Sequence, residues 1–155
     1  TQRIKIVEKV SSYYDGSIVG KKFALWGLAF KPNTDDIREA PVLYIIDELT
    51  KMGASVRAYD PEAMDNIKQA IGDKIEYAPN QYDALKDADA LIIATEWSVF
   101  RTPDFNKISD LLKEKVIFDG RNLYKPAPVE KLGYYYASIG RQTVNELEKT
   151  LTDLN

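Results

Sequence analysis

Charged side chains that could bind an anionic ligand are concentrated in one unusually long loop. The loop, residues 28–39, follows a short apolar run at residues 23–26 that stops at Gly27, and a helical pattern begins after it at Pro41. It holds two cations, three anions, an amide, a hydroxyl and an aromatic ring: Phe30, Lys31, Asn33, Thr34, Asp35, Asp36, Arg38 and Glu39. Long loops without structure of their own are often functional. We therefore predict a ligand-binding loop at the carboxyl end of the first strand of a sheet.

A third cation, Arg121, directly follows another apolar run at residues 116–119. Because the carboxyl ends of parallel strands lie along one edge of a sheet, Lys31, Arg38 and Arg121 could converge there. Lysine offers a compact point charge, and arginine a planar fork that matches phosphate or carboxylate. The alternative for each cation is a solvated surface charge, or an ion pair with one of the loop carboxylates: Asp35, Asp36 or Glu39.

Several kinds of chemistry are excluded by composition. The chain has no cysteine, which removes disulfides, thiolate metal sites and cysteine nucleophiles. It has no histidine either, which removes the commonest general base and the commonest metal ligand. We therefore expect binding rather than self-contained catalysis, and we predict neither catalytic nor metal-binding residues in this chain.

Length and charge indicate an ordinary globular domain. A chain of 155 residues is long enough for a single core, and 45% apolar with 29% charged residues is typical of soluble domains. A net charge of −3 favours neither nucleic acid nor an anionic membrane surface. The apolar runs are too short to span a bilayer, and the first twenty residues lack a signal-peptide core. We expect a cytoplasmic protein that binds neither nucleic acid nor membrane.

Strand and helix patterns alternate along the chain. Strands are predicted at residues 23–26, 55–59, 75–78, 90–94, 116–119 and 134–138. Helices are predicted at residues 1–14, with Ile4, Val7 and Val10 as the apolar face, and at 41–52, 62–71, 80–86, 104–112 and 142–151. Such alternation predicts an α/β fold, a Rossmann-like open parallel sheet of about six strands flanked by helices.

The helix after the long loop has the clearest signals. Its apolar residues fall at i, i+3, i+4 and i+7: Val42, Ile45, Ile46 and Leu49. Pro41 suits the first helical position, and Gly53 suits the left-handed residue beyond the end. Ala40 is a poor N-cap, so the free N–H groups of the first turn are available to a bound anion.

Two further residues near predicted strand ends have two interpretations each. Asp60 could hold a ribose, as an acid at the end of a second strand does in dinucleotide folds. A turn or helix cap is the preferred interpretation, because Pro61 follows at once and the spacing from Gly27 is too long for the dinucleotide fingerprint. Trp97 could stack on a base or sugar, but packing into the core is preferred.

Four runs of residues together resemble a known family. Residues 27–41, then Tyr59-Asp60-Pro61, Thr95-Glu96-Trp97 and Asp119-Gly120-Arg121-Asn122, are similar in order and spacing to the carboxyl-terminal domain of the UDP-glucose/GDP-mannose dehydrogenase family. The resemblance covers most of residues 21–141, and its first run is highly specific. Family members join an amino-terminal NAD-binding domain, a central helix that also forms the dimer, and this domain, which holds the nucleotide of the sugar substrate.

The resemblance implies a role for each candidate residue. Phe30, Lys31 and Arg121 would line the UDP-sugar site, and Arg38 would reach across a cleft to NAD bound by the other domain. Residues 1–20 would be the stub of the central helix, residues 21–141 the nucleotide-sugar domain, and residues 142–155 a closing helix. The branch of the family that oxidises UDP-glucose, in two hydride transfers to two NAD, is the most similar.

The chain departs from the whole family in what it lacks. It has no Gly-x-Gly-x-x-Gly turn and no cysteine nucleophile, and Ala40 stands where many members have serine. The resemblance therefore implies a fragment without dehydrogenase activity of its own. Alternatives that stay open are a GDP-mannose or UDP-N-acetylhexosamine substrate, a free-standing nucleotide-binding module, and, for the start at Thr1, a processed or tagged small protein.

Overall fold

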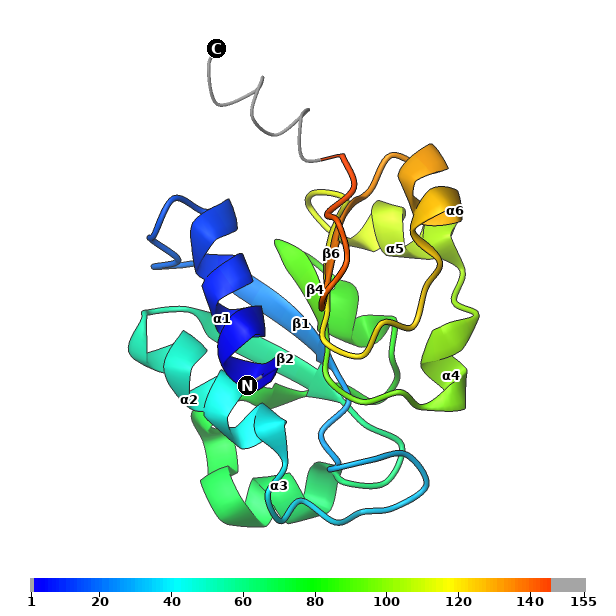
Figure 1. Ribbon diagram of the computed structural model, residues 1–155. Helices are drawn as coiled ribbons and strands as arrows, with labels where there is room; N and C mark the ends of the chain where they lie inside the picture. Colours follow the sequence, from blue (N-terminus) through cyan, green and yellow to red (C-terminus); the bar gives the residue numbers. More distant parts are fainter. Residues whose placement is uncertain (1, 146–155) are drawn as a thin grey trace.

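The computed structural model of the protein describes residues 2–145, which form an open six-stranded sheet flanked by helices (Figure 1). The strands are β1 Lys22–Trp26, β2 Ser55–Tyr59, β3 Glu76–Tyr77, β4 Ala90–Ile93, β5 Val116–Asp119 and β6 Tyr135–Ser138. Every neighbouring pair is parallel, in the order β3-β2-β1-β4-β5-β6. The predicted α/β fold with a Rossmann-like parallel sheet is confirmed. Its crossovers reverse direction between β1 and β4, which creates a switch point at the carboxyl ends of these strands.

The helices are α1 Gln2–Tyr13, α2 Pro41–Lys51, α3 Met64–Ile71, α4 Ser98–Arg101, α5 Phe105–Leu111 and α6 Pro126–Lys131, with the 3₁₀ turns η1 Gly72–Lys74 and η2 Asp83–Leu85. Helix α3 begins two residues later than predicted, and η2 replaces a longer predicted helix. Helices α4 and α6 were not predicted, because four and six residues are too few to establish a period. None of the described helices is both long and apolar enough to cross a bilayer.

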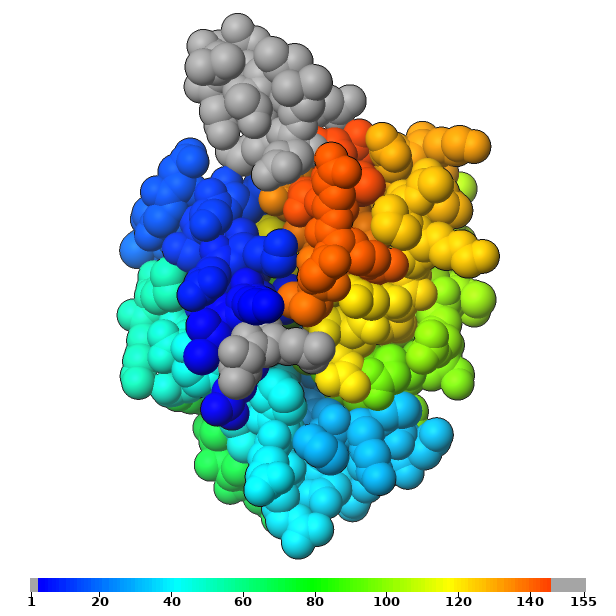
Figure 2. All heavy atoms as spheres, viewed as in Figure 1, coloured from blue at the N-terminus to red at the C-terminus, as the bar shows by residue number. Residues whose placement is uncertain are grey.

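Helix α2 confirms the prediction from its sequence. All four residues of its apolar stripe are buried: Val42, Ile45, Ile46 and Leu49. Pro41 is the first helical residue, Ala40 is the N-cap without a side-chain hydrogen bond, and Gly53 has a φ of 91°. The helix packs beside α1, which crosses the same face of the molecule (Figure 2).

Helix α1 buries a different face from the predicted one. Val7 and Val10 are buried as predicted, but Ile4 is 39% exposed and Ile6 is 1% exposed. The residues that face the sheet are therefore Ile6, Val7 and Val10, at i, i+1 and i+4. The period of the helix was predicted correctly, but its rotation depends on packing against α2 and β5.

The centre of the sheet forms the core. Every residue of β4 and β5 is buried. The continuous apolar run of β4 is typical of a strand covered on both faces. The Trp26 ring stacks on Phe100 at 5.0 Å between ring centroids, and its Nε1 donates to the Gln81 carbonyl at 2.8 Å. These contacts anchor the end of β1, which directly precedes the long loop.

The predicted closing helix at residues 142–151 lies mostly outside the described residues. Its first four positions, 142–145, are described and are not helical. Val144 instead forms an isolated antiparallel bridge with Tyr136 of β6, with backbone N–H groups donating in both directions at 3.1 and 3.3 Å. This pairing to an edge strand outweighs the helical periodicity at these positions.

Candidate functional site

The loops that follow β1, β2, β4 and β5 begin side by side at one edge of the sheet. Backbone hydrogen bonds continue the pairing past the strand ends: Gly27 N–H donates to the Tyr59 carbonyl, and Ala94 N–H to the Trp26 carbonyl, both at 2.9 Å. Gly120 N–H donates to the Ile93 carbonyl at the same distance. The candidate residues predicted from the sequence all follow these strand ends.

Asp60, at the end of β2, is 1% exposed and both its carboxylate oxygens are occupied. Oδ1 accepts the backbone N–H groups of Glu62 and Ala63, each at 2.8 Å. This geometry confirms the turn of the preferred interpretation, a turn or helix cap; the helix-cap part is not seen, because the N-cap of α3 is Ala63. The same oxygens cannot receive a ribose hydroxyl, so the alternative interpretation was wrong.

Asp60 also makes three longer-range contacts that the sequence did not predict. Its Oδ2 accepts the N–H groups of Leu28 at 2.7 Å and Ala29 at 3.1 Å, and Nε1 of Trp97 at 3.0 Å. One buried carboxylate thus joins the loops after β1, β2 and β4. Trp97 is 7% exposed, so its preferred role in packing is confirmed.

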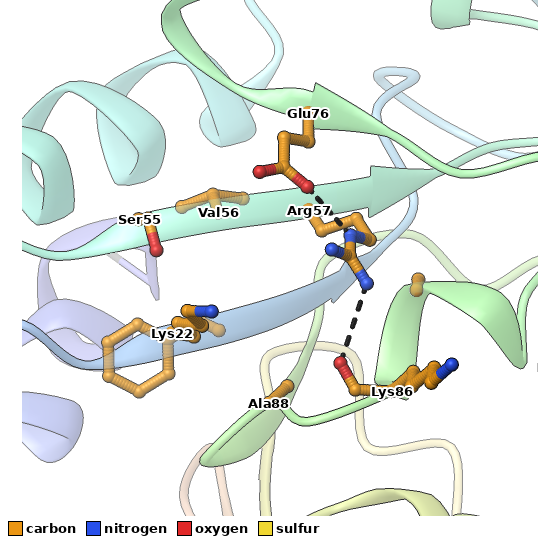
Figure 3. Close-up of a pocket in the computed structure, with 9 residues that line it drawn as sticks. Lys22, Ser55, Val56, Arg57, Glu76, Lys86 and Ala88 are labelled. Carbon is orange, nitrogen blue, oxygen red and sulfur yellow. Dashed lines mark hydrogen bonds and ion pairs between the residues drawn. The ribbon is translucent and has the colours of Figure 1, made fainter.

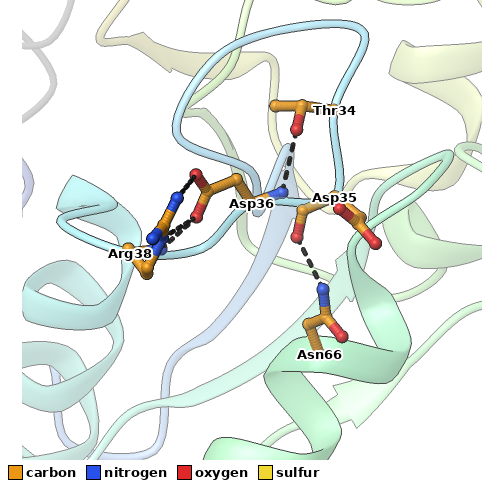
Figure 4. Close-up of polar contacts among 5 residues, drawn as sticks. All are labelled: Thr34, Asp35, Asp36, Arg38 and Asn66. Atoms are coloured by element: carbon orange, nitrogen blue, oxygen red, sulfur yellow. Dashed lines mark hydrogen bonds and ion pairs between the residues drawn. The ribbon is translucent and has the colours of Figure 1, made fainter.

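The long loop is closed by its own hydrogen bonds and attached to α3 (Figure 4). Phe30 N–H donates to the Asp36 carbonyl at 2.8 Å, and Asp36 N–H to Thr34 Oγ1 at 3.1 Å. Asn66 of α3 donates from Nδ2 to the Asp35 carbonyl at 2.8 Å. Hydrogen bonds therefore hold the loop together and to α3, although it contains no helix or strand.

Arg38 forms an ion pair within the loop. Its Nε donates to Asp36 Oδ1 at 3.1 Å and its Nη2 to Asp36 Oδ2 at 2.9 Å, while its side chain stays 87% exposed (Figure 4). The alternative interpretation, pairing with a loop carboxylate, is confirmed for this residue. The hydrogen bonds from Arg38 lower the pKa of the Asp36 carboxyl to about 2.

This pairing predicts an acid titration that mutation should shift. Because the pKa of Asp36 is lowered in the folded protein, the pair is intact above about pH 4 and is lost as the pH falls through about 2. The Asp36 carboxyl ¹³C resonance should titrate near pH 2, and near pH 4 in Arg38→Gln. A midpoint near pH 4 in the unsubstituted chain would contradict the paired geometry. The effect on stability should be small, because the pair is solvent-exposed.

Arg121 lies between the ends of β4 and β5, where its Nε donates to the carboxylate of Glu96. Both side chains are partly buried, at 29% and 20% exposure. Arg121 also lines a small hollow between α1, the first turn of α2 and the two strand ends, together with Arg3 and Pro41. Two cations and an uncapped helix N-terminus thus border the same space, an arrangement that favours an anion.

The predicted convergence of cations is seen in part. Phe30 is 43% exposed and Lys31 is exposed, both on the loop after β1. Within residues 2–145, no hydrogen bond or ion pair joins either of them to Arg121. Lys31 acts at longer range on Asp36, whose pKa it helps to lower. The candidate residues share one edge of the sheet without direct contact.

A second hollow lies at the opposite edge, at the amino ends of β1, β2 and β3 (Figure 3). There Arg57 donates from Nε to Glu76 at 2.9 Å and from Nη1 to the Lys86 carbonyl at 3.4 Å. None of the predicted site residues lines it. In the described part of the chain, no three acidic, histidine or cysteine side chains are grouped to hold a metal ion.

The chain is similar to known proteins over most of its length. Residues 24–126 match the UDP-glucose/GDP-mannose dehydrogenase family, UDP binding domain. UDP-glucose 6-dehydrogenase TuaD of Bacillus subtilis is 43% identical over 147 residues, covering 95% of this chain and 32% of the relative. UDP-glucose 6-dehydrogenase of Pseudomonas aeruginosa is 41% identical over 145 residues, covering 90% and 32%. The chain spans about a third of the length of these relatives.

Solved structures show the same fold. The UDP-glucose dehydrogenase of Pyrobaculum islandicum superposes with a TM-score of 0.70 at 31% identity, covering 80% of this chain and 27% of that one. An NDP-N-acetyl-D-galactosaminuronic acid dehydrogenase from Methanosarcina mazei gives 0.76 at 26% identity, covering 90% and 29%. The four runs of residues singled out in the sequence all lie within the matched range, residues 24–126. The chain belongs to the UDP-glucose/GDP-mannose dehydrogenase family and contains its UDP-binding domain.

Proposed function

We propose that the chain is the UDP-sugar-binding part of an NAD-dependent UDP-glucose 6-dehydrogenase, which oxidises UDP-glucose to UDP-glucuronate with two NAD. One observation carries the proposal. The run most specific to the family, residues 27–41, forms the ordered loop at the switch point of the sheet, where open α/β sheets bind their ligands. Two curated relatives, 43% and 41% identical to this chain, carry the name of that enzyme.

In this proposal Phe30, Lys31 and Arg121 bind the UDP-sugar. The half-exposed ring of Phe30 offers a surface for a base or sugar, and Lys31 offers an unobstructed ammonium group. Arg121 is held by Glu96 beside the uncapped first turn of α2. Its fork and the N–H groups of that turn would bind phosphate oxygens. These contacts are electrostatic and would orient the nucleotide rather than react with it.

The residues of this sheet do not fit a dinucleotide of its own. Only Gly27 stands where the fingerprint has three glycines, and both oxygens of Asp60 are already bonded. We therefore assign NAD to another part of the enzyme, with Arg38 as the contact from this chain. The highly exposed Arg38 guanidinium could exchange Asp36 for a phosphate oxygen of the cofactor.

The proposal also divides the chain and names its partners. Residues 1–20 would belong to the central helix, residues 21–141 to the nucleotide-sugar domain, and residues 142–155 to its carboxyl-terminal extension. The amino-terminal and central domains of the same enzyme would complete the active site. The central helix would also carry the homodimer.

A second candidate function keeps the family but changes the substrate to GDP-mannose or a UDP-N-acetylhexosamine. The name of the dehydrogenase from Methanosarcina mazei specifies an N-acetylated sugar. Its TM-score of 0.76 is larger than the 0.70 of the UDP-glucose dehydrogenase from Pyrobaculum islandicum. Its lower identity, 26% against 43% for the Bacillus relative, favours the UDP-glucose candidate. Competition of UDP, GDP and their sugars for the complete enzyme would separate the two candidates.

Removing either proposed phosphate contact should weaken UDP binding. In Lys31→Ala or Arg121→Ala, one charge-assisted contact of roughly 1.5–3 kcal/mol is lost, which is about a ten- to hundredfold rise in Kd. NMR titration of the chain with UDP measures this even at millimolar affinity. Lys86→Ala, a cation of the hollow at the opposite edge, is the matched control and should leave Kd unchanged. Unaltered affinity in both site variants would exclude the assignment.

A further inference from the structure

We infer that Asp60 and Thr95 are positioning residues, which fix the backbone before Phe30 and Lys31 and so present these two side chains to the ligand. The inference rests on the proposed function, because it assigns Phe30 and Lys31 to the UDP-sugar. Neither positioning residue would touch the ligand. Each would act through the peptide groups of Leu28 and Ala29.

The carboxylate of Asp60 fixes the donors of this segment. Its Oδ2 accepts the N–H groups of Leu28 at 2.7 Å and Ala29 at 3.1 Å. Its Oδ1 is anchored by the N–H groups of Glu62 and Ala63 in the turn after β2. With the carboxylate itself 1% exposed, water cannot replace these bonds at low cost.

Thr95 fixes the backbone carbonyl of Ala29, the hydrogen-bond acceptor of the segment that Asp60 holds by its N–H groups. Its Oγ1 donates to the Ala29 carbonyl at 2.9 Å, and the residue is 1% exposed. Thr95 comes from the end of β4, on the other side of β1 from Asp60. The N–H and the C=O of Ala29 are therefore held by side chains from the two strands that flank β1.

The next backbone group is fixed as well. Phe30 N–H donates to the Asp36 carbonyl at 2.8 Å. The result is a backbone restrained up to Phe30, with Leu28 and Ala29 buried at 0% and 1% exposure, and then a side chain that is 43% exposed. A restrained backbone that carries exposed side chains lowers the entropy cost of binding.

Three near-isosteric substitutions test the inference by NMR titration of the chain with UDP. In Asp60→Asn, the amide NH₂ must face the donors at one of the two oxygen positions, so at least two hydrogen bonds are lost. The bonds that remain, those to Leu28 and Ala29 included, lose the charge of their acceptor and weaken. We expect Kd to rise about tenfold or more, with altered ¹H–¹⁵N shifts for the Leu28 and Ala29 amides. Thr95→Val keeps the shape and removes only the donor to Ala29. We expect Kd to rise roughly three- to tenfold.

Trp97→Phe is the matched control, because it removes a donor to Asp60 but keeps both bonds to the loop backbone. It should lower Tm and leave Kd for UDP within about twofold of the parent. A loss of binding in Trp97→Phe equal to that in Asp60→Asn would show general destabilisation and overturn the inference.

Different experimental results would overturn the inference and the proposed function. If the parent chain binds UDP in a Lys31-dependent manner while Asp60→Asn and Thr95→Val bind equally well, only the inference is overturned. If Asp60→Asn does not fold, Thr95→Val alone decides. If the parent chain does not bind UDP even at millimolar concentration, the proposed function and the inference both fall.

Discussion

Replacing Gly27 with alanine is expected to destabilise the protein by about 3 kcal/mol or more. Gly27 has a φ of 101°, which L-residues rarely adopt and which costs roughly 1–3 kcal/mol. A Cβ at this position would lie 2.5 Å from both Cβ and Oγ1 of Thr95 and 2.6 Å from its backbone nitrogen. Overpacking of this kind adds roughly 1–3 kcal/mol. Thr95 cannot retreat freely, because its hydroxyl is bonded to Ala29.

Gly20 provides the matched control. Its φ is 79°, but a Cβ there would meet no atom within 4 Å. Gly20→Ala should therefore cost only the backbone strain, about 1–2 kcal/mol. Urea unfolding of the two variants measures both free energies. Equal losses would contradict the close approach of Thr95 to Gly27.

The crowding at Gly27 explains how this sheet differs from a dinucleotide-binding one. In the dinucleotide fingerprint, glycines at this turn leave room for the backbone to approach a pyrophosphate. Here Thr95, rather than a bound pyrophosphate, fills the space beside Gly27. The single glycine at the switch point therefore serves internal packing, and in the proposed function the longer loop that follows binds the ligand.

The strands and the main helix could be predicted because their signals are local. The continuous apolar run of β4 indicates burial on both faces, and the strand is central in the sheet. The stripe of α2 lies within one helix, with Pro41 and Gly53 marking its ends. The rotation of α1 was predicted wrongly, with Ile4 in place of Ile6, because it depends on the neighbours of the helix rather than on its own period.

In the candidate site, too, contacts between residues close in sequence could be predicted and contacts between distant residues could not. The pair of Arg38 with Asp36 spans two residues, and the sequence presented it as one of two alternatives. The pair of Arg121 with Glu96 and the bonds from Asp60 to Leu28 and Ala29 join residues 25 to 32 positions apart. They require the strand order, because β1 must lie beside β2, and β4 beside β5, before these groups can meet. A strand-end acid followed by proline was the available signal for Asp60, and it indicated only the turn.

A second large effect is expected from Asp119, the buried acid at the end of β5. The residue is 0% exposed, and its Oδ1 accepts the N–H of Arg121 at 2.8 Å. Its Oδ2 accepts the N–H of Leu123 at 2.7 Å and the hydroxyl of Tyr136 at 2.6 Å. Asp119→Ala leaves three donors without their acceptor, each worth about 1–3 kcal/mol when buried. We expect a loss of about 3 kcal/mol or more in the free energy of unfolding.

Tyr136→Phe separates the contributions to this network. Burial, and then the Asp119 carboxylate, raises the pKa of the Tyr136 hydroxyl, so it remains a donor across the ordinary pH range. Removing it leaves Asp119 with two backbone donors. It also takes the acceptor from Arg141 Nη2, at 3.0 Å, and from the Tyr124 N–H, at 3.3 Å. The loss should be about 1.5–3 kcal/mol, smaller than in Asp119→Ala. Asp119→Ala removes the acceptor of the Arg121 N–H, whereas Tyr136→Phe keeps it. We therefore expect Asp119→Ala to weaken UDP binding and Tyr136→Phe to leave it unchanged. Weaker UDP binding in Tyr136→Phe would contradict this prediction.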